Sequence, residues 1–226
     1  MSNPVFLVDS SVNLAVGLTV RLDGEEGRHA ALVRRIASGE VVDLCDGQGQ
    51  RATGTVTAVG KDWLEIALDQ VSLEEPTPVR LVAVQALAKG DRSELAVEML
   101  TEVGVDVIIP WRAEHSIVKW DNTDKAREKW RRTVREATKQ SRRAFMPTVE
   151  ALHTTDEIAS AIAQAKLAIV LHESATDALS QLSIPESGTV LIIVGPEGGI
   201  SARELDLFAS VGAHVVRMGR SVMRTS

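Results

Sequence analysis

A glycine-rich loop is the first feature of this sequence that could bind a ligand. Gly195-Pro196-Glu197-Gly198-Gly199 follows the apolar run Val190–Val194 and precedes a helical segment. The loop lacks the Gly-Lys-Ser/Thr of a P-loop and does not have the G-x-G-x-x-G spacing of dinucleotide sites, where Glu197 would also oppose a pyrophosphate. Two interpretations stay open: a tight strand-to-helix turn that uses glycine for positive φ, or a site for a nucleoside without phosphate.

Two further polar loops follow apolar runs in the same half of the chain. "LHES" covers Leu171–Ser174, and "MGRSVMRTS" covers Met218–Ser226. If the three runs are parallel strands, their carboxyl ends meet at the edge where open α/β sheets bind ligands. The sequence therefore predicts one converging site, in which exposed backbone groups read an adenine-like edge.

A basic segment supplies charge that could attract phosphates. Lys125–Arg143 holds nine Lys or Arg residues and two Glu, a net charge of +7. Because the whole chain carries −6, the remainder carries −13. An acidic protein with one concentrated basic helix can still attract a nucleic acid locally. Helical periodicity spreads these side chains around the axis, so some of them are expected to face solvent or acidic partners.

Composition narrows the class of protein. The 226 residues are 44% hydrophobic, which is enough for a sizeable core, and no apolar run approaches the ~20 residues that span a bilayer. The start "MSNPVFLVDSS" has no pattern of a signal peptide. A single cysteine, Cys45, excludes an internal disulfide and favours a reducing, cytoplasmic location. One cysteine and five scattered histidines offer no metal-site spacing, so we expect no metal.

Two dissimilar halves must position these residues. The linker "SLEEPTPVR", Ser72–Arg80, separates short alternating runs with turns at Asp46-Gly47 and Gly60-Lys61-Asp62 from longer, continuously apolar runs. We expect a small β-barrel with one helix near Glu25–Ile36 in residues 1–73. In residues 74–226 we expect an α/β domain with a parallel sheet covered on both faces. Capping boxes are predicted at Asp91/Glu94 and at Ser201/Glu204, each opening a helix.

The three loops, "LHE", "IVGPEGG" and "MGRSVMRTS", together resemble the methyl-donor pocket of the SPOUT class of methyltransferases. More narrowly, the chain resembles the bacterial enzymes that methylate N3 of a uridine in small-subunit (16S) ribosomal RNA, the RsmE group. Three other stretches are similar to that group: "HAALVRRIASGE", "KGDRSELAVEMLTEVGV" and "EATKQSRRAFMP". Each motif alone is weak, but their order along nearly the whole chain is specific.

The resemblance implies a fold and a set of partners. The expected fold is a PUA-like β-barrel RNA-binding domain followed by an α/β domain with a SPOUT-type trefoil knot. The expected donor is S-adenosylmethionine, the expected substrate is ribosomal RNA or the small ribosomal subunit, and the expected assembly is a homodimer. Met99 stands where the family usually has lysine. The family's final helix is expected to be missing from this chain, whose last residue is Ser226.

The resemblance also carries roles onto individual residues. Arg143 is the candidate catalytic residue, because a guanidinium near the uracil oxygens would stabilise a developing uridylate anion. The donor would be bound by the residues of the three loops: Leu171, His172, Glu173, Gly195, Pro196, Glu197, Gly198, Gly199, Met218, Gly219, Val222, Met223, Arg224 and Thr225. RNA would be bound by Arg34, Arg35, Lys89, Arg92, Lys139, Gln140, Ser141 and Arg142.

Several alternatives stay open at this point. His172 and Glu197 are candidates for a general base; the alternatives are that His172 packs in the donor pocket and that Glu197 caps the next helix. Trp111, Trp120 and Trp130 could stack on bases but are expected in the core or at an interface. A SPOUT enzyme acting on another RNA atom and a non-catalytic RNA-binding or assembly factor are the competing functions. A dinucleotide-dependent oxidoreductase is disfavoured by the loop spacing.

Overall fold

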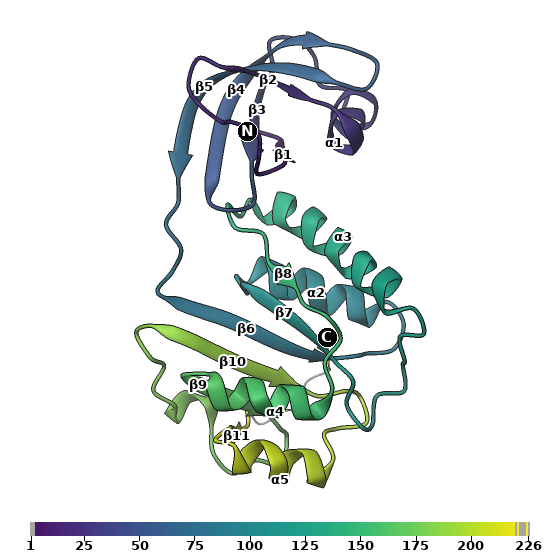
Figure 1. The fold of residues 1–226 in the computed structure, drawn as a ribbon, viewed down its shortest axis with the longest axis vertical. Coiled ribbons are helices and arrows are strands. Elements are labelled where there is room, and N and C mark those ends of the chain that lie inside the picture. Colours follow the sequence, from purple (N-terminus) through teal and green to yellow (C-terminus); the bar gives the residue numbers. More distant parts are fainter. Residues whose placement is uncertain (1–2, 220, 222–224, 226) are drawn as a thin grey trace. The chain divides into compact units, whose positions relative to one another are not determined.

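The chain folds into two compact units, each built around its own sheet (Figure 1). The computed structural model describes residues 3–219, 221 and 225. The first unit comprises the described residues up to Pro76 together with Thr138–Met146. The second comprises Thr77–Ala137 and the described residues from Pro147 onward.

The first unit contains a five-stranded curled sheet that forms a half-barrel in the described part of the chain. The strand order is β1-β3-β4-β5-β2; β1 runs parallel to β3 and the other neighbours are antiparallel. The bounds are β1 Val5–Leu7, β2 Thr19–Leu22, β3 Val41–Cys45, β4 Gln50–Val59 and β5 Leu64–Leu73. Alternate apolar side chains, among them Leu44, Leu64 and Ile66, fill its core.

The turns and the helix of this unit were predicted correctly. Residues 46–49 connect β3 to β4, and residues 60–63 connect β4 to β5. The helix expected near Glu25–Ile36 is present as α1, Gly24–Arg28, which continues into a π-helical turn, η1, His29–Val33. Arg34 is the C-cap of this turn, and the next residue, Arg35, has a φ of 54°, in the left-handed region that non-glycine residues seldom adopt.

The second unit contains a six-stranded sheet in its described residues, and every neighbouring pair is parallel, as predicted. The strand order is β11-β9-β10-β6-β7-β8. The strands are β6 Val79–Ala86, β7 Val107–Trp111, β8 Thr148–Val149, β9 Leu167–Leu171, β10 Gly188–Val194 and β11 His214–Val216. The helices are α2 Arg92–Glu102, α3 Thr123–Ser141, α4 Thr155–Gln164 and α5 Ala202–Ser210, with a short 3-10 turn, η2, at Leu179–Gln181.

Side chains on both faces of this sheet are buried, which explains the continuous apolar runs. Strand residues such as Val84 and Ile193 pack with Ile158 of α4 and Phe208 of α5 in one cluster. Ala83, next to Val84 in β6, points to the opposite face and is buried as well. None of the described helices is long and apolar enough to cross a membrane.

One of the two predicted capping boxes is present and the other is not. Ser201 accepts a hydrogen bond from the Glu204 N–H and Glu204 bonds back to Ser201, so α5 begins as predicted. The box at Asp91 is wrong: Asp91 has helical φ and ψ of −70° and −6°, and its side chain caps nothing. An N-cap residue needs an extended backbone to bring its oxygen to the N3 N–H. Glu94 binds Lys129 Nζ at 2.8 Å instead.

Candidate functional site

A cavity of about 340 Å³ lies at the carboxyl edge of the parallel sheet. The order of the strands changes direction between β6 and β10, which are neighbours in the sheet although 109 positions separate Val82 from its partner Leu191. Such a switch point is where α/β sheets form a crevice for ligands. The loops after β9, β10 and β11 all line the cavity, as the sequence predicted.

Nine of the predicted donor-binding residues line the cavity: Leu171, His172, Glu173, Gly195, Pro196, Gly199, Met218, Gly219 and Thr225. Glu197 and Gly198 belong to the same loop but are not among the lining residues. Val222, Met223 and Arg224 lie outside the described residues. The binding roles of all these residues stay predictions.

The cavity is also lined by residues that the sequence did not predict: Gln85, Ala96, Met99, Leu100, Val194, Ile200, Arg217 and Ser221. Gln85 stands at the end of β6, and Met99 lies on α2. The signal for Gln85 was a polar residue ending an apolar strand, but only the strand order shows that β6 borders the glycine loop. Gln85 is buried, and its Nε2 donates to the carbonyls of Ala86 (3.1 Å) and Thr225 (3.4 Å).

The glycines of the loop serve the packing of the loop itself as well as the cavity. A Cβ at Gly195 would lie 2.6 Å from Ile200 Cγ1, and a Cβ at Gly198 would lie 3.0 Å from His115 Cβ. Gly199 has a φ of +76°, and it closes a turn by donating to the Pro196 carbonyl at 2.9 Å. Loop geometry therefore requires glycine at these positions, even where no ligand approaches.

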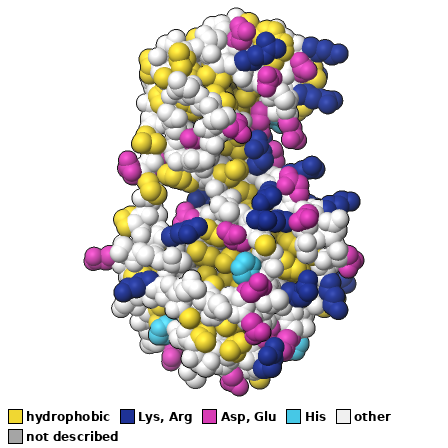
Figure 2. Space-filling model, in the orientation of Figure 1, with side chains coloured by type: hydrophobic (Ala, Val, Ile, Leu, Met, Phe, Trp, Pro, Cys, Tyr) yellow, Lys and Arg dark blue, Asp and Glu magenta, His cyan; other side chains and the backbone are white. Residues whose placement is uncertain are grey.

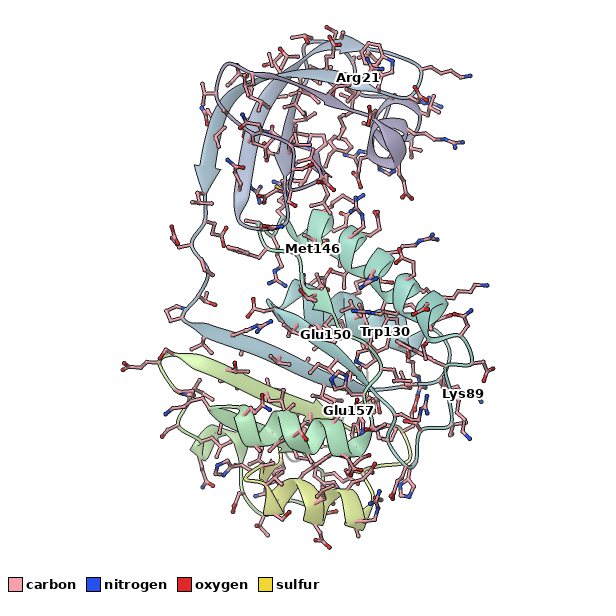
Figure 3. All side chains as sticks on the ribbon, in the orientation of Figure 1. Arg21, Lys89, Trp130, Met146, Glu150 and Glu157 are labelled. Atoms are coloured by element: carbon pink, nitrogen blue, oxygen red, sulfur yellow. The ribbon has the colours of Figure 1, made fainter. Side chains whose placement is uncertain are left out.

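The carboxylate of Glu197 turns toward the loop between β6 and α2. It accepts the Lys89 N–H at 2.9 Å, and one oxygen lies 3.9 Å from Arg92 Nη1. The expectation that Glu197 caps the following helix is wrong, because Ser201 is the N-cap of α5. Lys89 stands on the exposed surface of this loop (Figure 3).

His172 begins the loop that follows β9. Its backbone N–H donates to the Val216 carbonyl at 2.9 Å, and its Nδ1 accepts the Ser174 N–H at 3.3 Å. A neutral imidazole whose Nδ1 accepts carries its proton on Nε2, where it is a donor. This contact favours a pocket-forming role for His172 over a general base.

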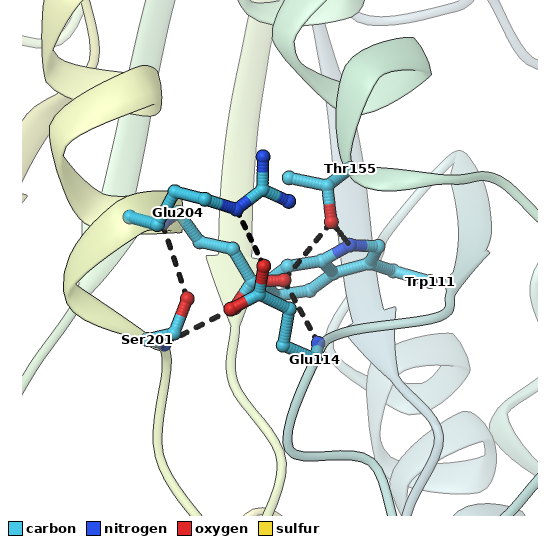
Figure 4. A network of polar contacts seen from close by, with 6 residues as sticks. Trp111, Glu114, Thr155, Ser201 and Glu204 are labelled. Carbon is cyan, nitrogen blue, oxygen red and sulfur yellow. Dashed lines mark hydrogen bonds and ion pairs between the residues drawn. The ribbon is translucent and has the colours of Figure 1, made fainter.

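Behind the glycine loop lies a buried polar network (Figure 4). Glu204 is fully buried, and its carboxylate accepts from the Ser201 N–H (3.1 Å), the Thr155 hydroxyl (2.9 Å) and the Glu114 N–H (2.9 Å). Trp111 Nε1 donates to the same Thr155 hydroxyl at 3.2 Å. The loop after β7, the start of α4 and the N-cap of α5 are thus joined through one carboxylate, whose burial is offset by these donors.

Glu114 lies at the surface of this network. Hydrogen bonds from the Ser201 hydroxyl and the Arg203 guanidinium hold the pKa of Glu114 below its ordinary value. In turn, the hydrogen bond to Glu114 raises the pKa of Arg203.

The candidate catalytic residue, Arg143, follows directly on the end of α3. Arg142 has a φ of 57°, and the N–H groups of Arg142 and Arg143 bond to the carbonyls of Lys139 (3.3 Å) and Thr138 (3.1 Å). This pair of bonds around a left-handed residue is the Schellman motif that ends many helices, usually with glycine. Arg143 is half-buried, and its catalytic role stays a prediction.

The segment after α3 is bound to the half-barrel of the first unit. Met146 N–H donates to the Gly47 carbonyl at 2.9 Å, and Gly49 N–H donates to the Ala144 carbonyl at 3.1 Å. Arg51 Nη2 donates to the Arg142 carbonyl at 2.5 Å. Asp43, which is buried, lies 3.5 Å from Arg51 Nη1. No pattern in the sequence indicates that β4 and the turn before it bind this segment.

The predicted RNA-binding residues differ in their exposure. Arg34, Arg35, Lys89, Arg92, Gln140 and Arg142 are exposed, and Ser141 is half-buried. Lys139 is different: its ammonium lies 3.0 Å from Glu26 Oε1, and both side chains are 8% exposed. This placement favours an anchoring role for Lys139 over a phosphate contact.

Lys and Arg side chains gather on the surface over α3, with acidic side chains among them (Figure 2). The expectation that some would meet acidic partners is confirmed by Lys129 with Glu94 and by Lys139 with Glu26. The bond to Glu94 raises the pKa of Lys129. Trp111 and Trp130 are core residues, as expected. Trp120 packs edge-to-face on Trp130, with 5.1 Å between ring centroids. The described residues contain no cluster of His, Cys, Asp and Glu that could hold a metal ion.

Comparison with known proteins adds a family to this geometry. Residues 75–226 match the family described as RNA methyltransferase domain, and residues 22–69 match the family described as RNA methyltransferase PUA domain. A protein of Mycobacterium bovis named ribosomal RNA small subunit methyltransferase E is 38% identical over 98% of this chain and 86% of its own length. A Bacillus subtilis protein of the same name is 27% identical over 92% of this chain and 85% of its own length.

Solved structures of similar proteins cover the whole chain. A ribosomal RNA small subunit methyltransferase E from Neisseria gonorrhoeae, bound to S-adenosyl methionine, has a TM-score of 0.88 at 28% identity and covers 99% of this chain and 92% of its own. A putative methyltransferase from Legionella pneumophila, in complex with the cofactor SAM, has a TM-score of 0.89 at 25% identity, with coverage of 100% and 93%.

The family match extends over most of the chain, and the relative from M. bovis is similar over nearly all of it. Both the half-barrel unit and the parallel-sheet unit find their counterparts in these comparisons. The chain therefore belongs to the family of RNA methyltransferases that join a PUA domain to a methyltransferase domain.

Proposed function

We propose that the protein transfers a methyl group from S-adenosylmethionine to N3 of a uridine in small-subunit (16S) ribosomal RNA. It is an S-adenosylmethionine-dependent ribosomal RNA methyltransferase, as its family membership and the names of its relatives support. The observation that carries the proposal is the cavity in which three polar loops converge at the carboxyl edge of the sheet.

The cavity suits this donor in size and chemistry. Its volume of about 340 Å³ falls in the range typical of small-molecule sites. Apolar walls from Leu100, Val194 and Ile200 would hold an adenosine, and Glu173 and Arg217 place one charge of each sign at the cavity. Opposite charges would suit the ammonium and carboxylate of a methionyl group, and an acidic side chain also suits a sulfonium. When bound, the donor supplies the electrophilic methyl group.

The acceptor nitrogen must lose a proton before it can attack. Uridine N3 carries a proton at neutral pH, so the site must stabilise a developing negative charge on the uracil oxygens. We assign this role to Arg143, because a guanidinium stays charged and can donate two hydrogen bonds. The Schellman motif and the bond from Arg51 to the Arg142 carbonyl would fix the backbone from which Arg143 extends.

RNA contacts are assigned to the exposed members of the predicted set: Arg34, Arg35, Lys89, Arg92, Gln140 and Arg142, with Ser141 beside them. The exposed lysines and arginines of α3 would add salt-sensitive attraction to phosphates. Selection of one uridine would come from RNA shape and an exposed loop, because A-form helices hide the edges of their bases.

The remaining assignments follow from the family. We propose a homodimer, a trefoil knot in the methyltransferase domain, a PUA-like barrel in residues 1–73, a methyltransferase domain from residue 74 and a cytoplasmic location. Each is supported by the resemblance described above.

Methyl transfer to small ribosomal subunits that lack their native uridine methylation tests the proposal. Radiolabelled S-adenosylmethionine should yield N3-methyluridine, identified by nucleoside mass spectrometry. Arg143→Ala should lower kcat by at least about 100-fold, within the range for lost electrostatic stabilisation. Arg80→Ala, which removes an exposed arginine of β6, should leave the rate unchanged. Label at another atom, or no label with folded protein, would refute the assignment to uridine N3.

A further inference from the structure

His115 contacts the glycine loop, Gly195–Gly199, through its imidazole ring. It lies shortly after β7, and its Nδ1 is 3.1 Å from the Gly198 carbonyl oxygen and 3.2 Å from the Gly199 carbonyl oxygen. Carbonyl oxygens only accept hydrogen bonds, so Nδ1 must carry a proton and share it between the two. The contact therefore fixes the tautomer of a neutral His115.

His115 also packs closely against the loop at Gly198. A Cβ built at Gly198 would lie 3.0 Å from His115 Cβ and 3.2 Å from the His115 carbonyl oxygen. The space beside Gly198 is therefore filled by His115, and Gly198 does not line the cavity. Gly199, the next residue, does line the cavity and is held by the same imidazole.

The segment that carries His115 is itself held by a buried group. The Glu114 N–H donates to the Glu204 carboxylate, which also accepts from Ser201 at the end of the glycine loop (Figure 4). One fully buried carboxylate therefore fixes both the residue before His115 and the exit of the loop that His115 contacts. On the entry side, Glu197 binds the Lys89 N–H.

We propose that His115 is a positioning residue for the methyl donor. By sharing its Nδ1 proton between two carbonyls, it directs both oxygens toward itself and fixes the turn from Pro196 to Gly199, whose ends line the cavity. His115 is not among the residues that line the cavity, so it acts through the loop. The inference rests on the donor part of the proposed function and does not depend on which RNA atom is methylated.

The test uses substitutions that move the donor nitrogen. His115→Asn keeps an N–H at the position of Nδ1, His115→Gln moves it outward to that of Nε2, and His115→Leu removes it. The matched control is His153→Leu, because His153 Nδ1 also contacts a carbonyl, that of Ala151 at 2.8 Å, away from the cavity. Isothermal titration with S-adenosylmethionine and with S-adenosylhomocysteine gives Kd without RNA. Steady-state kinetics gives the KM for donor and for RNA separately.

We expect the Kd of His115→Asn for S-adenosylmethionine to be within about twofold of wild type. The same is expected of the control, His153→Leu. His115→Gln and His115→Leu should bind about 3- to 10-fold more weakly, a range set by the loss of one hydrogen bond. Their KM for donor should rise by the same factor while the KM for RNA stays constant. Equal affinities for the Asn, Gln and Leu variants, or a change confined to the KM for RNA, would overturn the inference. Donor binding without N3-methyluridine would refute the proposed reaction alone.

Discussion

The buried ion pair between Lys139 and Glu26 allows a decisive test of whether Lys139 binds RNA or holds the fold. Both side chains are 8% exposed and their charged atoms are 3.0 Å apart. Removing one partner leaves an uncompensated buried charge, which typically costs about 3–5 kcal/mol, whereas replacing both by apolar residues is often neutral. We therefore expect Lys139→Met and Glu26→Met each to destabilise the first unit by about 3–5 kcal/mol. The double variant should be within about 1–2 kcal/mol of wild type.

Hydrogen exchange of the β4 and β5 amides would measure this effect in the first unit alone, which bulk unfolding of a protein with two units would not. A loss of about 3–5 kcal/mol should speed exchange by two to four orders of magnitude for amides that open with the whole unit. Lys125→Met is the matched control, because Lys125 is exposed on the same helix. Its effect on exchange should be within about 0.5 kcal/mol.

RNA binding supplies the opposing measurement. A lysine that neutralises one phosphate lowers the slope of log K against log salt by about 0.7–0.9 when it is removed. We expect no change of slope for the double variant, in which the fold is restored. A lower slope in that variant, together with wild-type exchange in Lys139→Met, would show that Lys139 contacts RNA and that the ion pair is dispensable.

Three further predictions concern other parts of the molecule. Gly198→Ala should weaken donor binding about 10-fold by calorimetry, since its Cβ would press on His115, and the loss should shrink in a His115→Gly background. Glu204→Gln should destabilise the protein by about 1–3 kcal/mol, because an amide cannot accept at both positions; a melting temperature equal to that of Glu98→Gln, an exposed control, would contradict this. Burial raises the pKa of the Cys45 thiol to about 11 from 9.0, so stability that is fully present below pH 9 should fall by up to about 3 kcal/mol as the pH rises past 11. Denaturant titrations should show this fall, and Cys45→Ala should lack it.

Much of the candidate site could be predicted from the sequence because the patterns that specify it are local. An apolar strand followed by a glycine-rich turn and a capping box depends only on near neighbours, and the loop after β10 formed as expected. The three loops could be grouped in advance, because parallel strands place all their carboxyl ends at one edge. The Asp91 box failed for a local reason too: its motif was right, but the backbone of Asp91 is helical.

The contacts that support the site depend on residues far apart in the chain. Gln85 borders the glycine loop only because β6 pairs with β10, and no pattern within β6 specifies that partner. His115 meets Gly198 across 83 positions, and Lys139 meets Glu26 across 113. A histidine or a lysine has the same local signature whether it faces solvent, RNA or a buried carboxylate.

The sequence by itself determined the two kinds of sheet, the loops of the donor cavity and the family, because periodicity and ordered motifs are properties of neighbours along the chain. Only the tertiary structure decided which charges of α3 are buried in ion pairs, which glycines serve packing, and that the segment carrying Arg143 is bound by β4 and the turn before it. The physical reason is that burial and pairing are set by chain closure, which brings together residues whose local sequences carry no information about each other.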